Sequence, residues 1–152
     1  MIKRINIFFI FRVLIGLLFI FSGFQKLIGP YQNFLYVIQG YQVFNSQLEE
    51  IIARYFPWIE FFLGVFLFLG LWLSVVLRGV IVFFVSFIFI LSQALLRKLP
   101  VGECGCFGEK FSLPVHFMVF VDCALLAMTL FLFYNLYKTS VFSLDRYYSK
   151  SE

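Results

Sequence analysis

Four long apolar stretches constrain this chain more than any other feature. A helix needs about 20 mostly apolar residues to cross the hydrocarbon of a bilayer, and four segments approach or exceed that length: residues 5–28, 57–77, 79–96 and 114–137. Hydrophobic residues make up 62% of the 152-residue chain and charged residues only 13%, whereas soluble domains hold about 45–50% and about 25%. The sequence therefore predicts an all-α polytopic membrane protein, a bundle of four transmembrane helices.

The first apolar stretch begins like a signal peptide, with Lys3 and Arg4 ahead of the apolar run. However, Arg12 interrupts that run, and the small-residue pattern of a cleavage site does not follow it. We therefore expect a retained first transmembrane helix.

The segment between the first two spans, residues 31–56, is too polar to cross a bilayer. The residues Ser46–Glu49 fit a capping box, and apolar residues follow at helical spacing: Leu48, Ile51, Ile52 and Tyr55. The pattern predicts an amphipathic helix on the outer surface between helices 1 and 2, with a shorter one before it around Asn33–Gln39. A tight hairpin is expected at Arg78–Gly79, between the second and third spans.

The distribution of charge predicts the orientation. With four spans, both termini and the hairpin at 77–79 share one side, which carries most of the basic excess: Lys3, Arg4, Arg78, Lys138, Arg146 and Lys150. Cytoplasmic segments are enriched in Lys and Arg. We therefore expect the four spans to lie in a bacterial inner membrane, with both termini in the cytoplasm. Residues 1–137 form one membrane domain, and 138–152 a polar cytoplasmic tail. The scattered basic residues do not form the basic face that binds nucleic acid.

Several polar residues lie at membrane depth, where ionisable groups are costly and mark interior sites. Counted at about 1.5 Å per helical residue, they fall in the outer half of the bilayer: Lys26, Glu60, Gln93, Asp122 and Cys123. Lys26 and Glu60 have opposite charge and similar depth, so we expect them to pair. The alternative is that the pair only holds the helices together. Cys123 is expected to be a small core residue or a third redox thiol.

One face of the first helix carries residues spaced by three or four positions: Arg12, Gly16, Phe19, Gly23 and Lys26. The two glycines predict a close approach of a second helix. Arg12 lies in the inner half, and we expect its side chain to snorkel to the cytoplasmic headgroups.

The loop before the last span reads PVGECGCFGEKFSLP, residues 100–114, and holds Cys104 and Cys106. Two thiols separated by one residue close a small, strained disulfide, and strained, exposed disulfides are the labile or catalytic kind. The loop is expected on the periplasmic side, where disulfides persist. The pair therefore predicts thiol–disulfide chemistry.

Three other interpretations of the pair are open. A structural disulfide this short closes almost no loop and would stabilise little. The two cysteines could be reduced and without a role. Cys104, Cys106 and His116 could also offer ligands to copper or zinc, although no fourth ligand is evident.

Several motifs together resemble the DoxX-like membrane proteins, and specifically the MauE-type branch associated with redox chemistry and methylamine utilisation. The resemblance spans residues 8–137 and rests on Arg12-x3-Gly16, Phe21-Ser22-Gly23-Phe24-Gln25-Lys26, Pro57-x2-Glu60-x3-Gly64, Cys104-Gly105-Cys106-Phe107-Gly108 and Asp122. It implies a four-helix bundle that takes part in thiol–disulfide exchange with exported or thioredoxin-like proteins. Related members look like subunits of a quinone-linked oxidoreductase.

The sequence thus favours a membrane thiol–disulfide oxidoreductase, or its redox accessory, with Cys104 and Cys106 cycling between dithiol and disulfide. Lys26, Glu60 and Asp122 are expected to tune thiolate formation or to pass protons. A quinone is a candidate cofactor, although no motif shows a site for it. The alternatives are a non-catalytic subunit that offers a Phe-rich surface to other membrane subunits, and a copper- or zinc-handling protein.

Overall fold

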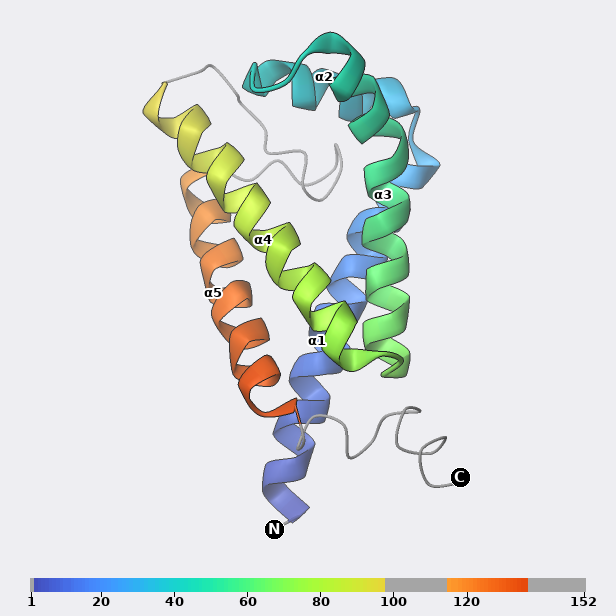
Figure 1. Ribbon diagram of the computed structural model, residues 1–152, viewed down its shortest axis with the longest axis vertical. Helices are drawn as coiled ribbons and strands as arrows, with labels where there is room; N and C mark the ends of the chain where they lie inside the picture. The colour runs from blue at the N-terminus through green and yellow to red at the C-terminus, as the bar shows by residue number, and fades with distance from the viewer. Residues whose placement is uncertain (1, 98–114, 137–152) are drawn as a thin grey trace.

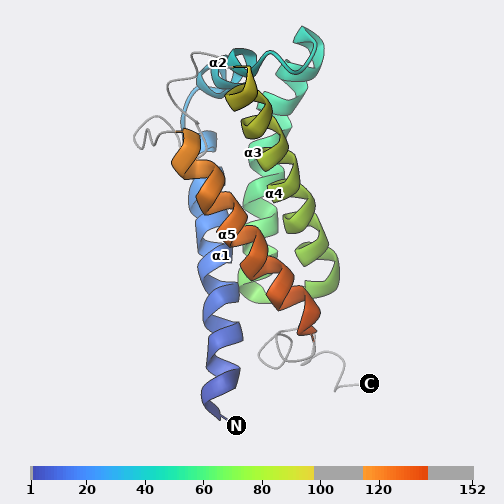
Figure 2. The ribbon, with the colours of Figure 1, turned by 90° about the vertical axis from the view of Figure 1, so that its left-hand side faces the viewer.

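The computed structural model describes residues 2–97 and 115–136, which form five helices. They are α1 (Ile2–Ile28), α2 (Tyr31–Tyr41), α3 (Ser46–Leu69), α4 (Leu73–Leu96) and α5 (Val115–Tyr134). The four long helices run alternately up and down, and α2 lies across the end opposite the chain termini (Figures 1 and 2). All four are long and apolar enough to cross a membrane. The predicted fold class, an all-α polytopic membrane bundle, is confirmed.

The closest contact in the bundle joins α1 to α3, and glycines make it possible. A Cβ atom added to Gly64 would lie 2.6 Å from the backbone nitrogen of Ile20, and one added to Gly23 would lie 2.8 Å from that of Phe61. These distances leave no room for a side chain, so the two backbones touch directly. The close approach predicted from the glycines of the first helix is confirmed.

The segment that was expected to form a separate outer helix, residues 46–56, is instead the first three turns of α3. The helix continues through Pro57, which is buried inside it. Its cap is Asn45, one residue before the predicted one, and the Asn45 side chain accepts a hydrogen bond of 2.9 Å from the Ser46 backbone nitrogen. The outer helix between the first two spans is α2, the predicted shorter helix, extended to Tyr31–Tyr41.

The hairpin between the second and third spans lies at residues 70–72, and the prediction of a turn at Arg78–Gly79 was wrong. Gly70 ends α3 with φ 72°, a left-handed conformation that glycine adopts without strain. Arg78 lies inside α4, where its guanidinium donates to the Ser74 hydroxyl at 2.8 Å and to the Ser74 backbone oxygen at 3.2 Å. Arg78, which interrupts the apolar run, is therefore a polar residue inside a helix and does not form a turn.

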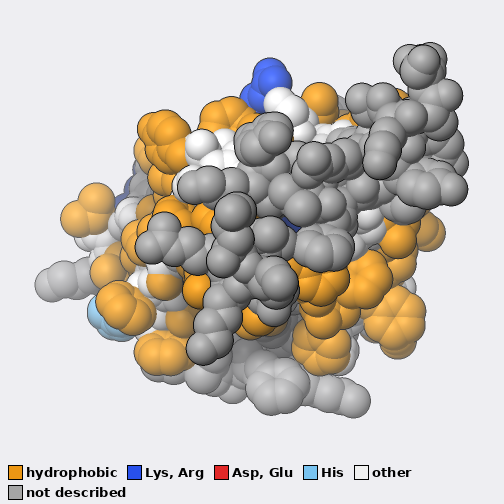
Figure 3. Space-filling view, turned by 90° about the horizontal axis from the view of Figure 1, so that it is seen from below, with side chains coloured by type: hydrophobic (Ala, Val, Ile, Leu, Met, Phe, Trp, Pro, Cys, Tyr) orange, Lys and Arg blue, Asp and Glu red, His pale blue; other side chains and the backbone are white. Residues whose placement is uncertain are grey.

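The surface of the bundle is apolar along its flanks and aromatic at both ends. Hydrophobic side chains extend around the described part of the bundle when it is seen from the end that carries the termini (Figure 3). Exposed Trp72 and Tyr134 lie at that end, and exposed Tyr36 and Tyr55 at the α2 end. Trp and Tyr concentrate at the two membrane–water interfaces. The hydrocarbon therefore lies between these two sets, with α2 at one interface.

The α1–α3 contact predicts the effect of one methyl group. We expect Gly64→Ala to lower the free energy of unfolding by about 1–3 kcal/mol, because the new Cβ meets backbone atoms that cannot yield. Gly40→Ala in α2 is the matched control, because a Cβ there meets nothing within 4 Å. Thermal unfolding in detergent, followed by tryptophan fluorescence, measures both variants. Equal stability of the two variants would contradict the close approach.

Candidate functional site

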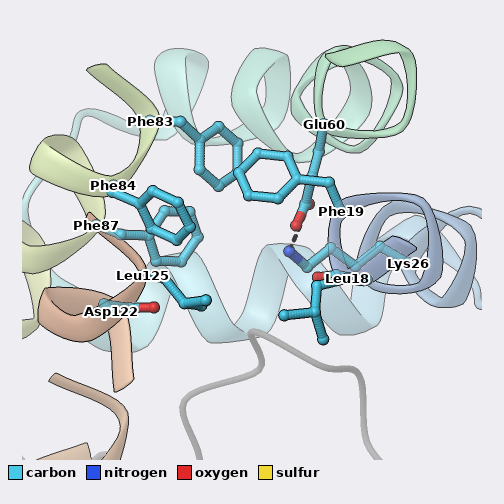
Figure 4. A pocket seen from close by; sticks show the side chains of 10 residues that line it. Leu18, Phe19, Lys26, Glu60, Phe83, Phe84, Phe87, Asp122 and Leu125 are labelled. Carbon is cyan, nitrogen blue, oxygen red and sulfur yellow. Dashed lines mark hydrogen bonds and ion pairs between the residues drawn. The ribbon is translucent and has the colours of Figure 1, made fainter. Parts of the chain in front are cut away.

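A small cavity lies inside the bundle, between α1, α3, α4 and α5 (Figure 4). Its volume is about 40 Å³, enough for a few water molecules, since one needs roughly 10–15 Å³ by this measure. Six of its lining residues are apolar: Leu18, Phe19, Phe83, Phe84, Phe87 and Leu125. The other four are polar: Ser22, Lys26, Glu60 and Asp122. Polar groups from three helices therefore converge on one apolar-walled space.

Lys26 and Glu60 form the ion pair that their charges and depths predicted. The Lys26 Nζ donates a hydrogen bond of 2.7 Å to Glu60 Oε2, and the two side chains are only 2% and 4% exposed. At this burial each charge has lost its water, so the partner and nearby groups must replace the lost solvation. The pair also connects α1 to α3 beside their glycine contact.

Aromatic rings complete the surroundings of the lysine. Its Nζ lies 5.1 Å from the ring centroid of Phe34 on α2 and 5.5 Å from that of Phe87 on α4. The electron-rich face of an aromatic ring attracts a cation, most strongly where water is excluded. Phe56 stacks against both Phe34 and Phe83, with centroid distances of 6.5 and 4.6 Å. The cation is therefore held by one carboxylate and by rings from two further helices.

Asp122 reaches the same cavity from α5 (Figure 4). The residue is 92% buried, and its Oδ2 atom accepts no hydrogen bond from the described residues. Tyr41 of α2 interacts electrostatically with this carboxyl. Its own burial and the charge of Asp122 together raise the pKa of Tyr41 to about 12. The phenol therefore stays protonated at neutral pH. Through Phe34 and Tyr41, α2 covers the polar site.

The other predicted site residues are not brought to this cavity. Gln93 is half-buried on α4 but does not line the cavity, and its Oε1 accepts no hydrogen bond from the described residues. Cys123 is exposed, so the expectation of a core position was wrong. Cys104 and Cys106 lie outside the described residues. His116 is exposed, and no group of three metal-ligating side chains occurs within residues 2–97 and 115–136.

Arg12 does not snorkel as predicted. Its side chain is among the most buried, at 1% exposed, and its guanidinium lies 5.2 Å from the ring centroid of Phe9. The cavity residue of α1 nearest to Arg12 is Leu18, six positions further on, so Arg12 lies about 9 Å along the helix from the cavity. The helix is long enough on its N-terminal side to carry Arg12 into the interior. It belongs to the packing of the other half of the bundle.

Sequence reasoning missed the contribution of α2 to the site. Phe34, Ile38 and Tyr41 recur at positions i, i+4 and i+7, the spacing of one helical face. Ile38 and Tyr41 are buried, and Phe34 is partly buried. That spacing was visible in the sequence. What it covers could be learned only from the fold, because α2 and its partners lie far apart in the chain.

Together, the four spans and the buried ion pair define a polytopic helical membrane protein with an intramembrane polar site. The chain belongs to the family of the methylamine utilisation protein MauE, whose model matches residues 4–135. This confirms the MauE-type resemblance, whereas the wider DoxX-like one stays a prediction. No curated protein and no solved structure matches the chain significantly.

The buried pair predicts a cost for removing either partner alone. We expect Lys26→Met or Glu60→Gln to lower the free energy of unfolding by about 3–5 kcal/mol, because the partner is left desolvated. The double variant should recover a large part of that loss. Glu50→Gln is the control: it breaks the exposed Arg54–Glu50 pair, 3.8 Å apart, and should cost at most about 1 kcal/mol. Additive single losses in the double variant would disprove the coupling.

Proposed function

We propose that this member of the MauE family is a membrane thiol–disulfide oxidoreductase or its redox accessory, with Cys104 and Cys106 as the exchanging pair. One observation carries the proposal. The described chain leaves α4 at Arg97 and enters α5 at Val115, both at the α2 end (Figure 1), and the nearest cavity residues on these helices, Phe87 and Asp122, lie about 15 Å and about 10 Å further along. The cysteine-bearing connection therefore starts and ends at the end of the bundle that α2 covers, about two to three helical turns from the buried ionisable groups.

The chemistry needs a thiolate, a disulfide and a way to move protons. In the proposed exchange, the thiolate of one cysteine attacks a sulfur of a partner's disulfide and forms a mixed disulfide. The second cysteine then attacks the first cysteine's sulfur in that mixed disulfide and releases the partner's thiolate, so Cys104–Cys106 is oxidised and the partner gains two electrons and two protons as its dithiol. The reverse sequence reduces Cys104–Cys106. Lys26, Glu60 and Asp122 would supply or accept protons near this chemistry.

The partner in this proposal is an exported or thioredoxin-like protein with a reactive cysteine pair, and the process is the methylamine utilisation in the family's description. A quinone is not assigned to the cavity. Sites for small organic ligands hold about 300–1,000 Å³, whereas this cavity holds about 40 Å³. Any membrane oxidant would thus have to act from the lipid-facing surface or through the partner.

Thiol trapping tests the proposal in membranes. We expect alkylation to report a change in the redox state of Cys104 and Cys106 when an oxidised or reduced thioredoxin-like protein is supplied. One of the two single variants, Cys104→Ser or Cys106→Ser, should trap a mixed disulfide with that protein: the one that keeps the attacking thiol and lacks the resolving thiol. Cys123→Ser is the matched control and should behave like the unchanged protein, because Cys123 lies exposed on α5 and does not line the cavity.

The same experiment separates the two alternatives. If Cys104 and Cys106 keep one state whatever partner is supplied, and the double serine variant still supports growth on methylamine, the protein is a structural subunit and the redox proposal fails. Stoichiometric copper or zinc, lost in His116→Ala, would instead identify metal handling.

For the orientation, we propose both termini in the cytoplasm and the α2 end outside, in a bacterial inner membrane. The four candidate spans give an even number of crossings, so one measurement fixes both ends. A green fluorescent protein fused to the C-terminus should fluoresce, and alkaline phosphatase fused there should be inactive. An active phosphatase fusion would reverse the orientation.

A further inference from the structure

We propose that the cavity is a proton-binding site, in which Asp122 holds the proton and water connects it to the Lys26–Glu60 pair. The proposal concerns the resting protein and stands without the cysteine chemistry. Its use in thiol–disulfide exchange rests on the function proposed above.

The number of charges at the cavity carries the argument. Its lining holds two carboxyl groups, Glu60 and Asp122, and one ammonium group, Lys26. If both carboxyls were ionised, the site would carry one net negative charge among apolar side chains. An uncompensated charge at such depth costs several kcal/mol, and binding one proton removes it. The neutral arrangement is therefore one ammonium, one carboxylate and one carboxylic acid.

Geometry assigns the proton to Asp122. Glu60 Oε2 accepts a charge-assisted hydrogen bond of 2.7 Å from Lys26, which holds that carboxyl in its ionised form. Asp122 has no such bond from the described residues: its Oδ2 is buried without a donor. A carboxylate there would have no cation as hydrogen-bond donor, whereas a carboxylic acid is neutral and carries a proton that it can donate itself.

Groups on the neighbouring helices do not change this count. From α2, Tyr41 faces Asp122 as a neutral phenol. From α4, the cavity lining consists of three phenylalanines. On α1, Ser22 is neutral, and Arg12 lies about 9 Å along the helix from the cavity. Among the described residues, Lys26 is thus the one cation lining the site.

Water completes the proposed site. The volume of about 40 Å³ holds roughly three or four waters at 10–15 Å³ each. Ser22, Lys26, Glu60 and Asp122 all line this space, so a water molecule there would find the two to four polar partners that buried water needs. Such water would give Asp122 Oδ2 its missing hydrogen bond. It would also let a proton pass between Asp122 and Glu60.

Infrared spectroscopy of the purified protein in lipid tests the charge count directly, because a protonated carboxyl absorbs apart from a carboxylate and shifts in heavy water. At neutral pH we expect one such band from this site, and Asp122→Asn should remove it. Glu60→Gln should also remove it, because Lys26 is then free to balance an ionised Asp122. Lys26→Met should double it, because both carboxyls must then be neutral.

Glu50→Gln serves as the control and should leave the spectrum unchanged, because Glu50 is exposed beside Arg54. Asp122→Asn and Glu60→Gln keep the side-chain shape, so the test stands even if Lys26→Met fails to fold. A band that survives Asp122→Asn, or one that survives Glu60→Gln at full intensity, overturns the proposal. The Cys104→Ser/Cys106→Ser variant should keep the band, so a failure of the redox function is distinguishable from a failure of this one.

Discussion

The direct contact between the backbones of α1 and α3 is the constraint on which the rest of the structure depends. Gly16 faces Gly64 and Phe68, and Gly23 faces Phe61, at distances that leave little or no space for a Cβ atom. In lipid, helices gain little from hydrophobic burial against each other, so such close packing holds them together. It also brings Lys26 within 2.7 Å of Glu60. The packing that stabilises the bundle thus also assembles its polar site.

An ion pair at this depth must be compensated, and aromatic rings supply part of that compensation. Phe34 and Phe87 approach the ammonium group of Lys26, and further phenylalanines stack behind them. The abundance of phenylalanine, 24 residues in the chain, therefore serves two purposes. The rings on the flanks face lipid, and those near the cavity offer an electron-rich face to a cation.

Much of the fold could be predicted from the sequence, because hydropathy and glycine spacing report directly on bilayer crossing and helix contact. The Lys26–Glu60 pair followed from charge and depth. The hairpin did not, since residues 70–72 are as apolar as the helices they join, while Arg78 looked like a boundary and is an internal helix residue. The polar start of α3 likewise concealed its continuity through Pro57. The exposure of Cys123 and Arg12 was also opposite to expectation, because it depends on the face of the helix that each residue occupies: Cys123 is exposed and Arg12 is buried.

The position of α2 links the interior site to the chemistry proposed for the connection between α4 and α5. Glu60 lies 14 residues after Ser46, so α3 extends about 21 Å beyond the ion pair, and α2 packs in that space. Arg97 at the end of α4 donates to the Gln42 backbone oxygen at 3.4 Å, which joins the end of α2 to the start of the cysteine-bearing connection. A partner that binds at this end would therefore act on the same elements that cover Lys26 and Asp122.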